Sequence, residues 1–165
     1  TLAMGDALAV VLLEKRGFKE EDFALFHPGG ALGKRLLLRV EDLMHTGKDV
    51  PLVLPDVLLR DALFEITSKK LGLTGIVDSQ GQMLGVFTDG DLRRIMGQGL
   101  ESLQLPISEV MTKSPKRILR RNLAAKALQI MESHSITSLF VFDGDEGTVP
   151  VGIVHLHDLL KSGVV

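Results

Sequence analysis

The sequence contains 165 residues, of which 45% are hydrophobic and 24% are charged, with a formal net charge of −2 at pH 7. The charge balance leaves no broad basic surface for nucleic acid, Tyr and Trp are absent as stacking platforms, and no apolar run is long enough to span a membrane. Because Cys is also absent, there is no disulfide framework, thiolate nucleophile or thiolate metal site. We therefore expect a cytoplasmic protein of one or two compact units, with no nucleic-acid or membrane partner.

The first segment, residues 2–14, has the apolar content of a helix that is buried on all sides, because almost no polar face remains on a helical wheel. Arg16 and Gly17 supply the basic last turn and the glycine that end such a helix. Its packing partners are not evident in the remaining sequence, and the chain starts at Thr1 rather than at a methionine. We therefore expect a fragment that continues a larger N-terminal domain.

The second segment is a short helix over residues 20–26, followed by His27-Pro28-Gly29-Gly30. The two glycines allow a ligand to approach the backbone closely, and His27 stands immediately before this turn. From the residues alone, a single histidine in such a place is more often structural than functional.

The sequence repeats itself from Val40 onward. Four blocks recur in the same order, 65 to 67 positions later: 40–44 with 107–111, 59–63 with 124–128, 76–78 with 141–143, and 85–92 with 152–159. Two internal copies of one supersecondary unit are therefore expected.

Each copy predicts a short helix, a short strand, a longer helix, a hairpin and a final helix. The predicted strands are 52–54 and 117–119, the longer helices 58–68 and 123–134, and the hairpin turns 79–81 and 143–147. The hairpin strands are apolar on both faces, which is typical of a sheet covered by helices. One repeat would be marginally stable alone, so we expect an α+β (mixed α/β) fold in which two β-α-β-β-α repeats pack around a pseudo-two-fold axis and leave two related clefts.

The most informative motif is Gly85-Val86-Phe87-Thr88-Asp89-Gly90-Asp91-Leu92, where a strand gives way to a helix. The Thr88 hydroxyl and the first N–H groups of the helix could face a phosphate, while Asp91 could accept from vicinal sugar hydroxyls. The alternative is that Asp91 merely caps a helix over residues 92–96. Arg93 and Arg94 could reach a phosphate, but adjacent helical side chains diverge, so we expect at least one of them to be solvated.

The second copy of the motif places His155 at the hydroxyl position and keeps Asp158. His155 could be a charged donor that favours anions at lower pH, or only a packing residue. His155 and His157 are two positions apart, but because Asp158 begins a helix and cysteine is absent, we predict no metal site. Met44 and Met111 are expected to fill gaps in the core.

These motifs make the chain resemble the cystathionine β-synthase (CBS) domain pair, or Bateman module, over residues 40–165. The resemblance lies in the D-x-M and E-V-M openings and the closing G-h-h-T-x-x-D-L, from which His155 departs. It implies that adenine nucleotides or related ligands bind in the clefts and regulate an attached domain. It also implies that Thr88 contacts phosphate, that Asp91 and Asp158 hold ribose, and that phosphate binding beside His155 is in doubt.

Residues 1–38 resemble the end of the sugar isomerase domain of the D-arabinose 5-phosphate isomerase family, through M-G-D-A-L-A, R-G-F and F-x-H-P-G-G-A-L-G-K-R-L-L. That family interconverts D-ribulose 5-phosphate and D-arabinose 5-phosphate through an enediol, in the supply of Kdo for lipopolysaccharide or capsule. The resemblance implies that His27 is the active-site histidine of the intact enzyme. The remaining catalytic groups would lie upstream, so we expect this chain to be catalytically silent.

The expected organisation is a sugar isomerase remnant and linker over 1–38, a first CBS domain over 39–104 and a second over 105–165. No cofactor is expected to be required, and the candidate regulatory ligands are AMP, ATP and CMP-Kdo. The alternative is a structural module that only holds the oligomer together, with empty clefts. We expect a homodimer of CBS pairs and a tetramer of the intact enzyme.

Overall fold

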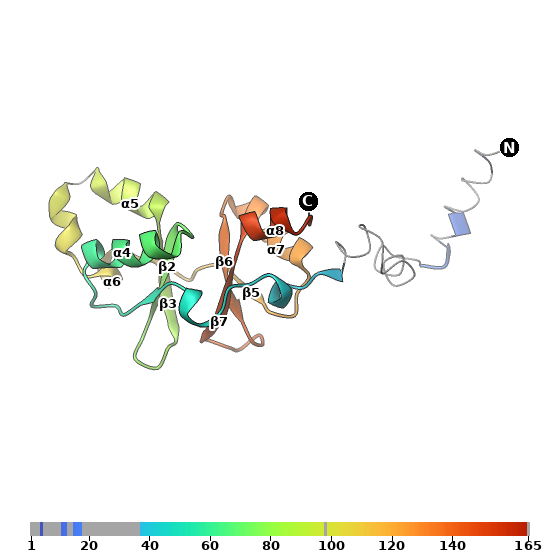
Figure 1. Cartoon of the computed structure of the whole chain (residues 1–165), viewed down its shortest axis with the longest axis horizontal. Helices are drawn as coiled ribbons and strands as arrows, with labels where there is room; N and C mark the ends of the chain where they lie inside the picture. Colours follow the sequence, from blue (N-terminus) through green and yellow to red (C-terminus); the bar gives the residue numbers. More distant parts are fainter. Residues whose placement is uncertain (1–3, 5–10, 13–14, 18–36, 98, 165) are drawn as a thin grey trace.

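The computed structural model describes residues 4, 11–12, 15–17, 37–97 and 99–164 (Figure 1). The described residues 4, 11, 12 and 15 are helical, and Gly17 follows with φ 62°, as the predicted helix end requires. Met4 and Val11 are exposed, so at these two described positions the burial expected on all sides of the helix is not seen. The short helix predicted over 20–26 and His27 lie outside the described residues. Across the described ranges, no helix has the length and apolar character needed to cross a membrane.

Two sheets form the centre of the described region. The first has the strand order β1-β2-β3-β4 and the second β5-β6-β7; β1 is parallel to β2 and β5 to β6, whereas β2–β3, β3–β4 and β6–β7 are antiparallel. The strands are β1 (Leu52–Val53), β2 (Leu73–Val77), β3 (Met83–Thr88), β4 (Thr112–Lys113), β5 (Arg117–Leu119), β6 (Ser138–Phe142) and β7 (Pro150–His155).

Helices and strands follow one another in the same order in both repeats, β1-α4-β2-β3-α5 in the first and β5-α7-β6-β7-α8 in the second. The helices are η1 (Val40–Asp42), η2 (Gly47–Asp49), α4 (Leu59–Lys69), α5 (Asp89–Met96), η3 (Leu100–Gln104), α6 (Ile107–Val110), α7 (Ala124–His134) and α8 (Leu156–Lys161). Figure 1 shows the two repeats side by side, each with its helices on one side and its hairpin turn projecting to the other. The predicted pair of β-α-β-β-α repeats is confirmed, with the central helices α4 and α7 each starting one residue later than predicted.

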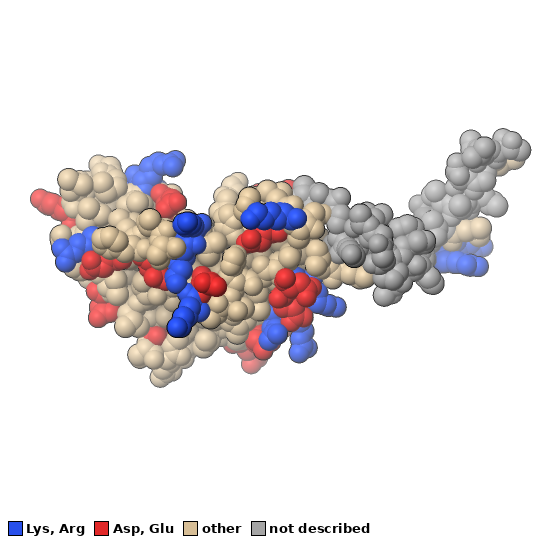
Figure 2. All heavy atoms as spheres, in the orientation of Figure 1, with Lys and Arg blue, Asp and Glu red and all other residues tan. Residues whose placement is uncertain are grey.

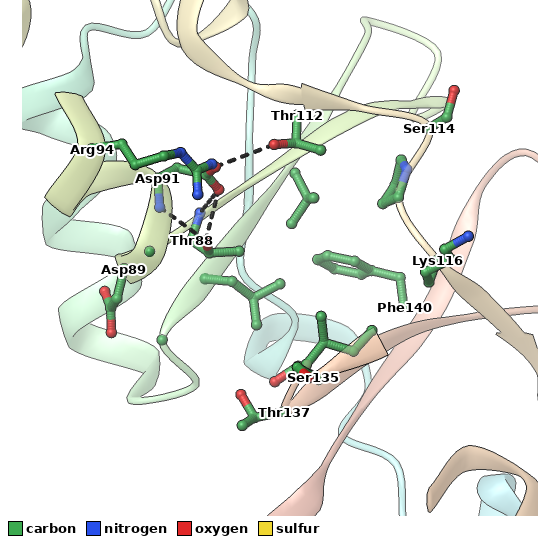
Figure 3. Close-up of a pocket in the computed structure, with 17 residues that line it drawn as sticks. Thr88, Asp89, Asp91, Arg94, Thr112, Ser114, Lys116, Ser135, Thr137 and Phe140 are labelled. Carbon is green, nitrogen blue, oxygen red and sulfur yellow. Dashed lines mark hydrogen bonds and ion pairs between the residues drawn. The ribbon is translucent and has the colours of Figure 1, made fainter. Parts of the chain in front are cut away.

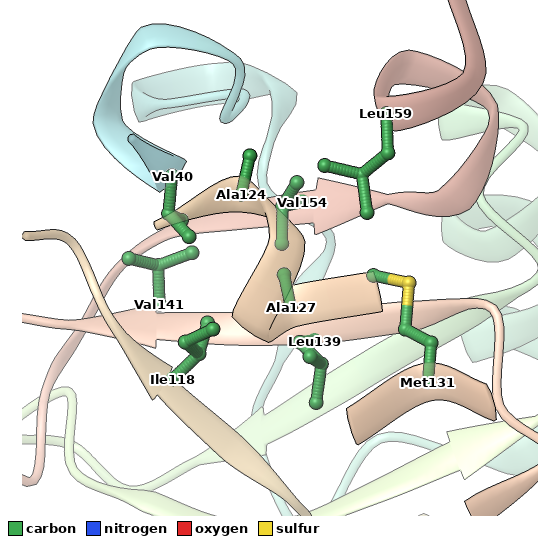
Figure 4. Close-up of a cluster of buried hydrophobic side chains, with 9 residues drawn as sticks. All are labelled: Val40, Ile118, Ala124, Ala127, Met131, Leu139, Val141, Val154 and Leu159. Atoms are coloured by element: carbon green, nitrogen blue, oxygen red, sulfur yellow. The ribbon is translucent and has the colours of Figure 1, made fainter. Parts of the chain in front are cut away.

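The first residues of each repeat pack in the hydrophobic core of the other repeat. Val40, at the start of the first repeat, is fully buried in the hydrophobic core of the second (Figure 4), whereas Ile107, at the start of the second, is fully buried in the core of the first. Their backbone N–H groups make matching bonds, Val40 to the Asn122 carbonyl at 2.9 Å and Ile107 to the Val57 carbonyl at 2.8 Å. Because burial of one such side chain contributes roughly 1.5–3 kcal/mol, this exchange holds the repeats together.

A third core lies where the two repeats meet. It combines Val50, Leu71 and Leu73 with aromatic and aliphatic residues of the second sheet, namely Phe140, Phe142 and Ile153. The expectation that both faces of the hairpin strands are covered is confirmed for β2, whose five residues are all buried. It is wrong for β3, in which Gly85 and Phe87 are buried while Leu84 is exposed and Val86 and Thr88 are half-buried. The alternating side chains of β3 point away from the core of their own repeat and are free to line a cleft.

The start of the last helix in the first repeat also differs from one prediction. The helix α5 begins at Asp89, so Thr88 is the N-cap and Asp91 is the third helical residue. Thr88 and Asp91 form a reciprocal capping box, in which each side chain accepts a backbone N–H of the other. Asp91 does help to cap the helix, but as its third residue through the capping box and not as the N-cap of a helix over 92–96.

The charged side chains are mixed in sign on the face shown in Figure 2, where Lys and Arg lie between Asp and Glu over both repeats. Such a surface produces no extended field of one sign.

Candidate functional site

A cavity of about 550 Å³ lies between the two repeats (Figure 3). The first repeat contributes the start of β2, one face of β3 and the first turns of α5. The second repeat contributes the segment that follows β4 and the connection from α7 into β6. The lining residues are Gly72, Leu73, Val86, Thr88, Asp89, Gly90, Asp91, Arg94, Thr112, Ser114, Pro115, Lys116, Ser135, Ile136, Thr137, Ser138 and Phe140.

The cavity has an apolar middle and a polar rim. Leu73, Val86 and Phe140 supply apolar surface, and Figure 3 shows the Phe140 ring directed toward the centre. Thr88, Asp91 and Arg94 lie on one side, Ser114 and Lys116 on the opposite side, and Ser135 and Thr137 on a third. Such a site can hold a flat apolar ring against the middle and polar substituents at the rim.

The Asp91 carboxylate is buried, with 4% of the residue exposed, and both oxygens accept hydrogen bonds. The Thr88 backbone N–H and hydroxyl donate to Asp91 Oδ2 at 2.9 and 2.7 Å. The Thr112 hydroxyl donates to Oδ1 at 3.2 Å, and the Arg94 guanidinium pairs with the same oxygen. Asp91 therefore closes the N-terminus of α5 through one oxygen and contacts the second repeat through the other.

The second copy of the motif shows the same arrangement with different chemistry. Asp158 Oδ2 lies 2.8 Å from His45 Nε2, and His155 Nδ1 accepts the His157 backbone N–H at 3.1 Å, which makes His155 the N-cap of α8. His45 is equivalent to Thr112, 67 positions later, since each follows the methionine of its repeat. Each motif aspartate thus bonds to the residue after the methionine of the opposite repeat.

The environment of His155 favours its neutral form. Burial is the largest influence and lowers the pKa of the imidazole; His157 and His45 lower it further, and Asp158 opposes them by raising it. A neutral imidazole keeps Nδ1 available as the acceptor that caps α8. Within the described ranges, no group of three His, Asp or Glu side chains could hold a metal ion.

The methionines explain the first glycine of each motif. A Cβ atom on Gly85 would lie 2.6 Å from Met111 Sδ, and one on Gly152 would lie 2.9 Å from Met44 Sδ. Each methionine therefore packs against the motif strand of the opposite repeat, and both also pack against hydrophobic cores, as predicted. This contact sets Thr112 and His45, the next residues, beside the motif aspartates.

Sequence reasoning selected Thr88, Asp91, His155 and Asp158, and the structure brings the first two together in one cavity and the last two together in the equivalent place. It missed His45, Thr112 and Lys116. The signal for His45 and Thr112 was present, because these residues directly follow the aligned blocks 40–44 and 107–111. Of the two adjacent arginines, Arg94 lines the cavity.

The two repeats exchange their first segments and share the cleft between them. The family model of the CBS domain matches residues 40–98 and 107–164. The chain belongs to the CBS domain family and contains a pair of these domains. Over all 165 residues it is 56% identical to arabinose 5-phosphate isomerase KdsD of Yersinia pestis, 54% to that of Escherichia coli strain K12 and 52% to that of Pseudomonas aeruginosa. It spans about half of each relative, 49%, 49% and 50% respectively.

Solved structures share the same fold. The CBS-domain protein ATU1752 of Agrobacterium tumefaciens superposes with a TM-score of 0.68 at 31% identity, covering 78% of this chain and 95% of that one. CBSX2, solved in complex with AMP, gives 0.66 at 23% identity over 77% and 96%. The CBS pair of MJ0100, solved with 5′-methylthioadenosine and S-adenosyl-L-methionine, gives 0.66 at 19% identity over 76% and 94%.

Proposed function

We propose that this chain is the regulatory, nucleotide-sensing part of an arabinose 5-phosphate isomerase. The proposal is supported by identity above 50% to such isomerases along the whole chain. In this assignment residues 1–38 are the end of a sugar isomerase domain and a linker, with His27 as a catalytic residue of the intact enzyme. Residues 39–104 and 105–165 are the two CBS domains, which sense a nucleotide or nucleotide sugar and regulate the isomerase in Kdo and lipopolysaccharide biosynthesis. The chain alone does not interconvert ribulose 5-phosphate and arabinose 5-phosphate.

The cavity between the repeats is the main structural support for the proposed sensing role. Its volume of about 550 Å³ falls within the usual range for small-molecule sites. A nucleobase fits the apolar middle, a ribose diol suits the Asp91 carboxylate, and a phosphate suits the cationic groups of the rim. The candidate ligands are AMP, ATP and the nucleotide sugar CMP-Kdo. AMP, 5′-methylthioadenosine and S-adenosyl-L-methionine are ligands of two proteins of this fold, but at 23% and 19% identity that likeness concerns the fold alone.

Calorimetric titration and thermal unfolding of the 165-residue chain with AMP, ATP and CMP-Kdo test the proposal. A ligand at 100 times its Kd adds about 2.7 kcal/mol to the free energy of unfolding. Asp91→Asn should weaken binding, whereas Asp61→Asn, on the exposed side of α4, should leave it unchanged. If no member of the panel binds or raises the melting temperature, the module is a structural one with empty clefts.

The same proposal includes assembly into a homodimer of CBS pairs, and into a tetramer in the intact enzyme. Phe64 on α4 and Leu100 in η3 support it, because they are 75% and 69% exposed on helices that contact each other. Apolar side chains so exposed are candidates for burial between subunits. Light scattering of the chain and of a Phe64→Glu variant tests this: the variant should be monomeric, and a monomeric parent chain would contradict the proposed dimer.

A further inference from the structure

We infer that Arg94 and Thr112 occupy the carboxylate oxygen of Asp91 that a nucleotide uses. The nucleotide binds by displacing them from this oxygen. This inference rests on the proposed function and concerns how the same cavity distinguishes its ligands. The ribose diol replaces Thr112 and Arg94 at Asp91 Oδ1, and the freed Arg94 guanidinium then contacts the 5′-phosphate. Arg94 is thus a specificity-determining residue that selects phosphorylated nucleosides over unphosphorylated ones.

The two oxygens of the Asp91 carboxylate differ in how readily they can exchange partners. Oδ2 accepts the Thr88 backbone N–H and hydroxyl, and these bonds belong to the capping box that begins α5. Their loss would leave the first turn of the helix without its cap. Oδ1 accepts the Thr112 hydroxyl at 3.2 Å, beyond the usual 2.5–3.0 Å for O–H···O bonds, and pairs with Arg94, whose side chain is 71% exposed. Oδ1 therefore has one long bond and one mostly exposed partner, and neither belongs to the capping box, so Oδ1 is the oxygen that can exchange its partners.

Arg94, and not the Thr88 hydroxyl, is the donor available for a phosphate. The Thr88 hydroxyl has one proton, which it donates to Asp91 Oδ2, and it accepts the Asp91 backbone N–H at 3.2 Å. A hydroxyl in this state has no proton left for a phosphate oxygen. Arg94 lies on the same side of the cavity and carries five N–H donors in a geometry that matches phosphate. Once the diol has taken Oδ1, Arg94 is the cation beside the ligand.

Thr112 connects ligand binding to the contact between the two repeats. Thr112 belongs to β4, which pairs with β3 through Val86 and Thr112 and leads into Ser114 and Lys116 on the far side of the cavity. Replacement of Thr112 at Asp91 removes a side-chain bond that joins the first repeat to the second. Nucleotide binding therefore changes the contact between the repeats at the point where the second begins, and this change is available as a regulatory signal.

The second motif offers an internal comparison. Asp158 also contacts the opposite repeat, through His45 at 2.8 Å, but the residue at the position of Arg94 is Lys161. Among the described residues, the ion pairs of Asp158 do not include Lys161. The exchange we infer therefore belongs to the first motif, where a planar guanidinium already contacts the carboxylate.

The test compares the Kd values of AMP and adenosine for the 165-residue chain and four variants, by calorimetry. Arg94→Gln should weaken AMP about tenfold, as expected for loss of one charge-assisted contact, while adenosine binds equally or more tightly. Arg93→Gln, the matched neighbour, should change either Kd by less than about twofold. Thr112→Val should tighten both ligands about threefold because a competitor for Oδ1 is removed, and Thr112→Ser, which keeps the hydroxyl, should not.

The outcomes separate this inference from the proposed function. If the unsubstituted chain binds neither AMP nor adenosine, the exchange is overturned, and the sensing role is overturned with it only when ATP and CMP-Kdo also fail to bind. If it binds AMP but Arg94→Gln changes AMP and adenosine by the same factor, or Thr112→Val weakens both, the sensing role stands and the exchange is wrong. Melting temperatures of all variants without ligand show whether each is folded, and the ratio of the two Kd values is insensitive to a uniform loss of folded protein.

Discussion

His45 Nε2 and Asp158 Oδ2 lie 2.8 Å apart, although 113 positions separate these residues in the sequence. The pair joins the first repeat to the last helix of the second, at the place where Thr112 joins the second repeat to Asp91 of the first. His45 and Thr112 occupy equivalent positions, as do Asp91 and Asp158. The pseudo-two-fold axis thus relates two polar contacts between repeats, one made by a hydroxyl and one by an imidazole.

A double-mutant cycle on His45 and Asp158 should show a modest coupling. The two side chains are 36% and 25% exposed, so solvent screens the interaction, and we expect about 0.5–1 kcal/mol between His45→Ala and Asp158→Ala in urea unfolding at neutral pH. Each single variant should destabilise the chain, and the double variant should cost less than their sum. Strictly additive effects would show that the contact contributes nothing to holding the repeats together.

The stability of the chain should decrease below neutral pH through His155. Burial lowers the pKa of His155 in the folded state, so below the unfolded value of about 6.5 the unfolded chain binds more protons than the folded one. The contribution is complete above about pH 6.5 and is lost as the pH falls through the lowered folded value. The groups facing this imidazole are Asp158, His157 and His45.

The measurement for His155 is urea unfolding at several pH values between about 7.5 and 5. His155→Thr keeps an oxygen that can accept the His157 N–H, so α8 stays capped while the titrating group is removed. This variant should lose less stability on acidification than the parent chain. Equal losses in the two proteins would assign the acid sensitivity to other groups.

The internal repeat predicted most of the fold, because the order and spacing of its blocks can be read directly from the sequence. The blocks around Met44 and Met111 have the same spacing as those around Asp91 and Asp158, and this spacing predicted the order of the elements. The hairpin turn at Gly81, with φ 79°, was predicted separately from the residue types that favour turns. The exchange of Val40 and Ile107 between cores was not predictable in this way. Both segments have the same apolar pattern whichever core they enter, and only the three-dimensional packing distinguishes the two arrangements.

The candidate site also has a part that the sequence predicted and a part that it did not. Thr88 and Asp91 were predictable because they are three residues apart and their spacing at a strand-to-helix junction has a mechanism. Thr112, which bonds to Asp91, and Lys116, which lines the same cavity, come from the second repeat, and no spacing rule connects them to Asp91. The commitment of the Thr88 hydroxyl to Asp91 was also invisible, because the direction of a single proton depends on the whole hydrogen-bond network.

Loss of the capping box at Thr88 should destabilise the chain independently of any ligand. Thr88→Val removes the hydroxyl that accepts the Asp91 N–H and donates to the carboxylate, and removal of such a cap costs about 1–2 kcal/mol. Thr88→Ser retains both bonds and should stay within about 0.5 kcal/mol of the parent chain. Urea unfolding without nucleotide measures both variants. Equal stability of the Val and Ser variants would mean that the start of α5 does not depend on the cap.

A methyl group at Gly85 should be poorly tolerated because two parts of the opposite segment occupy its place. An added Cβ would lie 2.6 Å from Met111 Sδ and 2.8 Å from the Thr112 backbone oxygen, so β4 would have to move away from β3. Overpacking of this kind costs about 1–3 kcal/mol, and Gly85→Ala should also weaken nucleotide binding because Thr112 and Asp91 are displaced. Gly97→Ala is the matched control: its backbone is right-handed helical, with φ −65°, and its added Cβ meets nothing closer than 3.4 Å. The control should be neutral or slightly stabilising, whereas Gly85→Ala should unfold at lower urea concentration, and equal midpoints for the two would contradict the close packing of Met111 on β3.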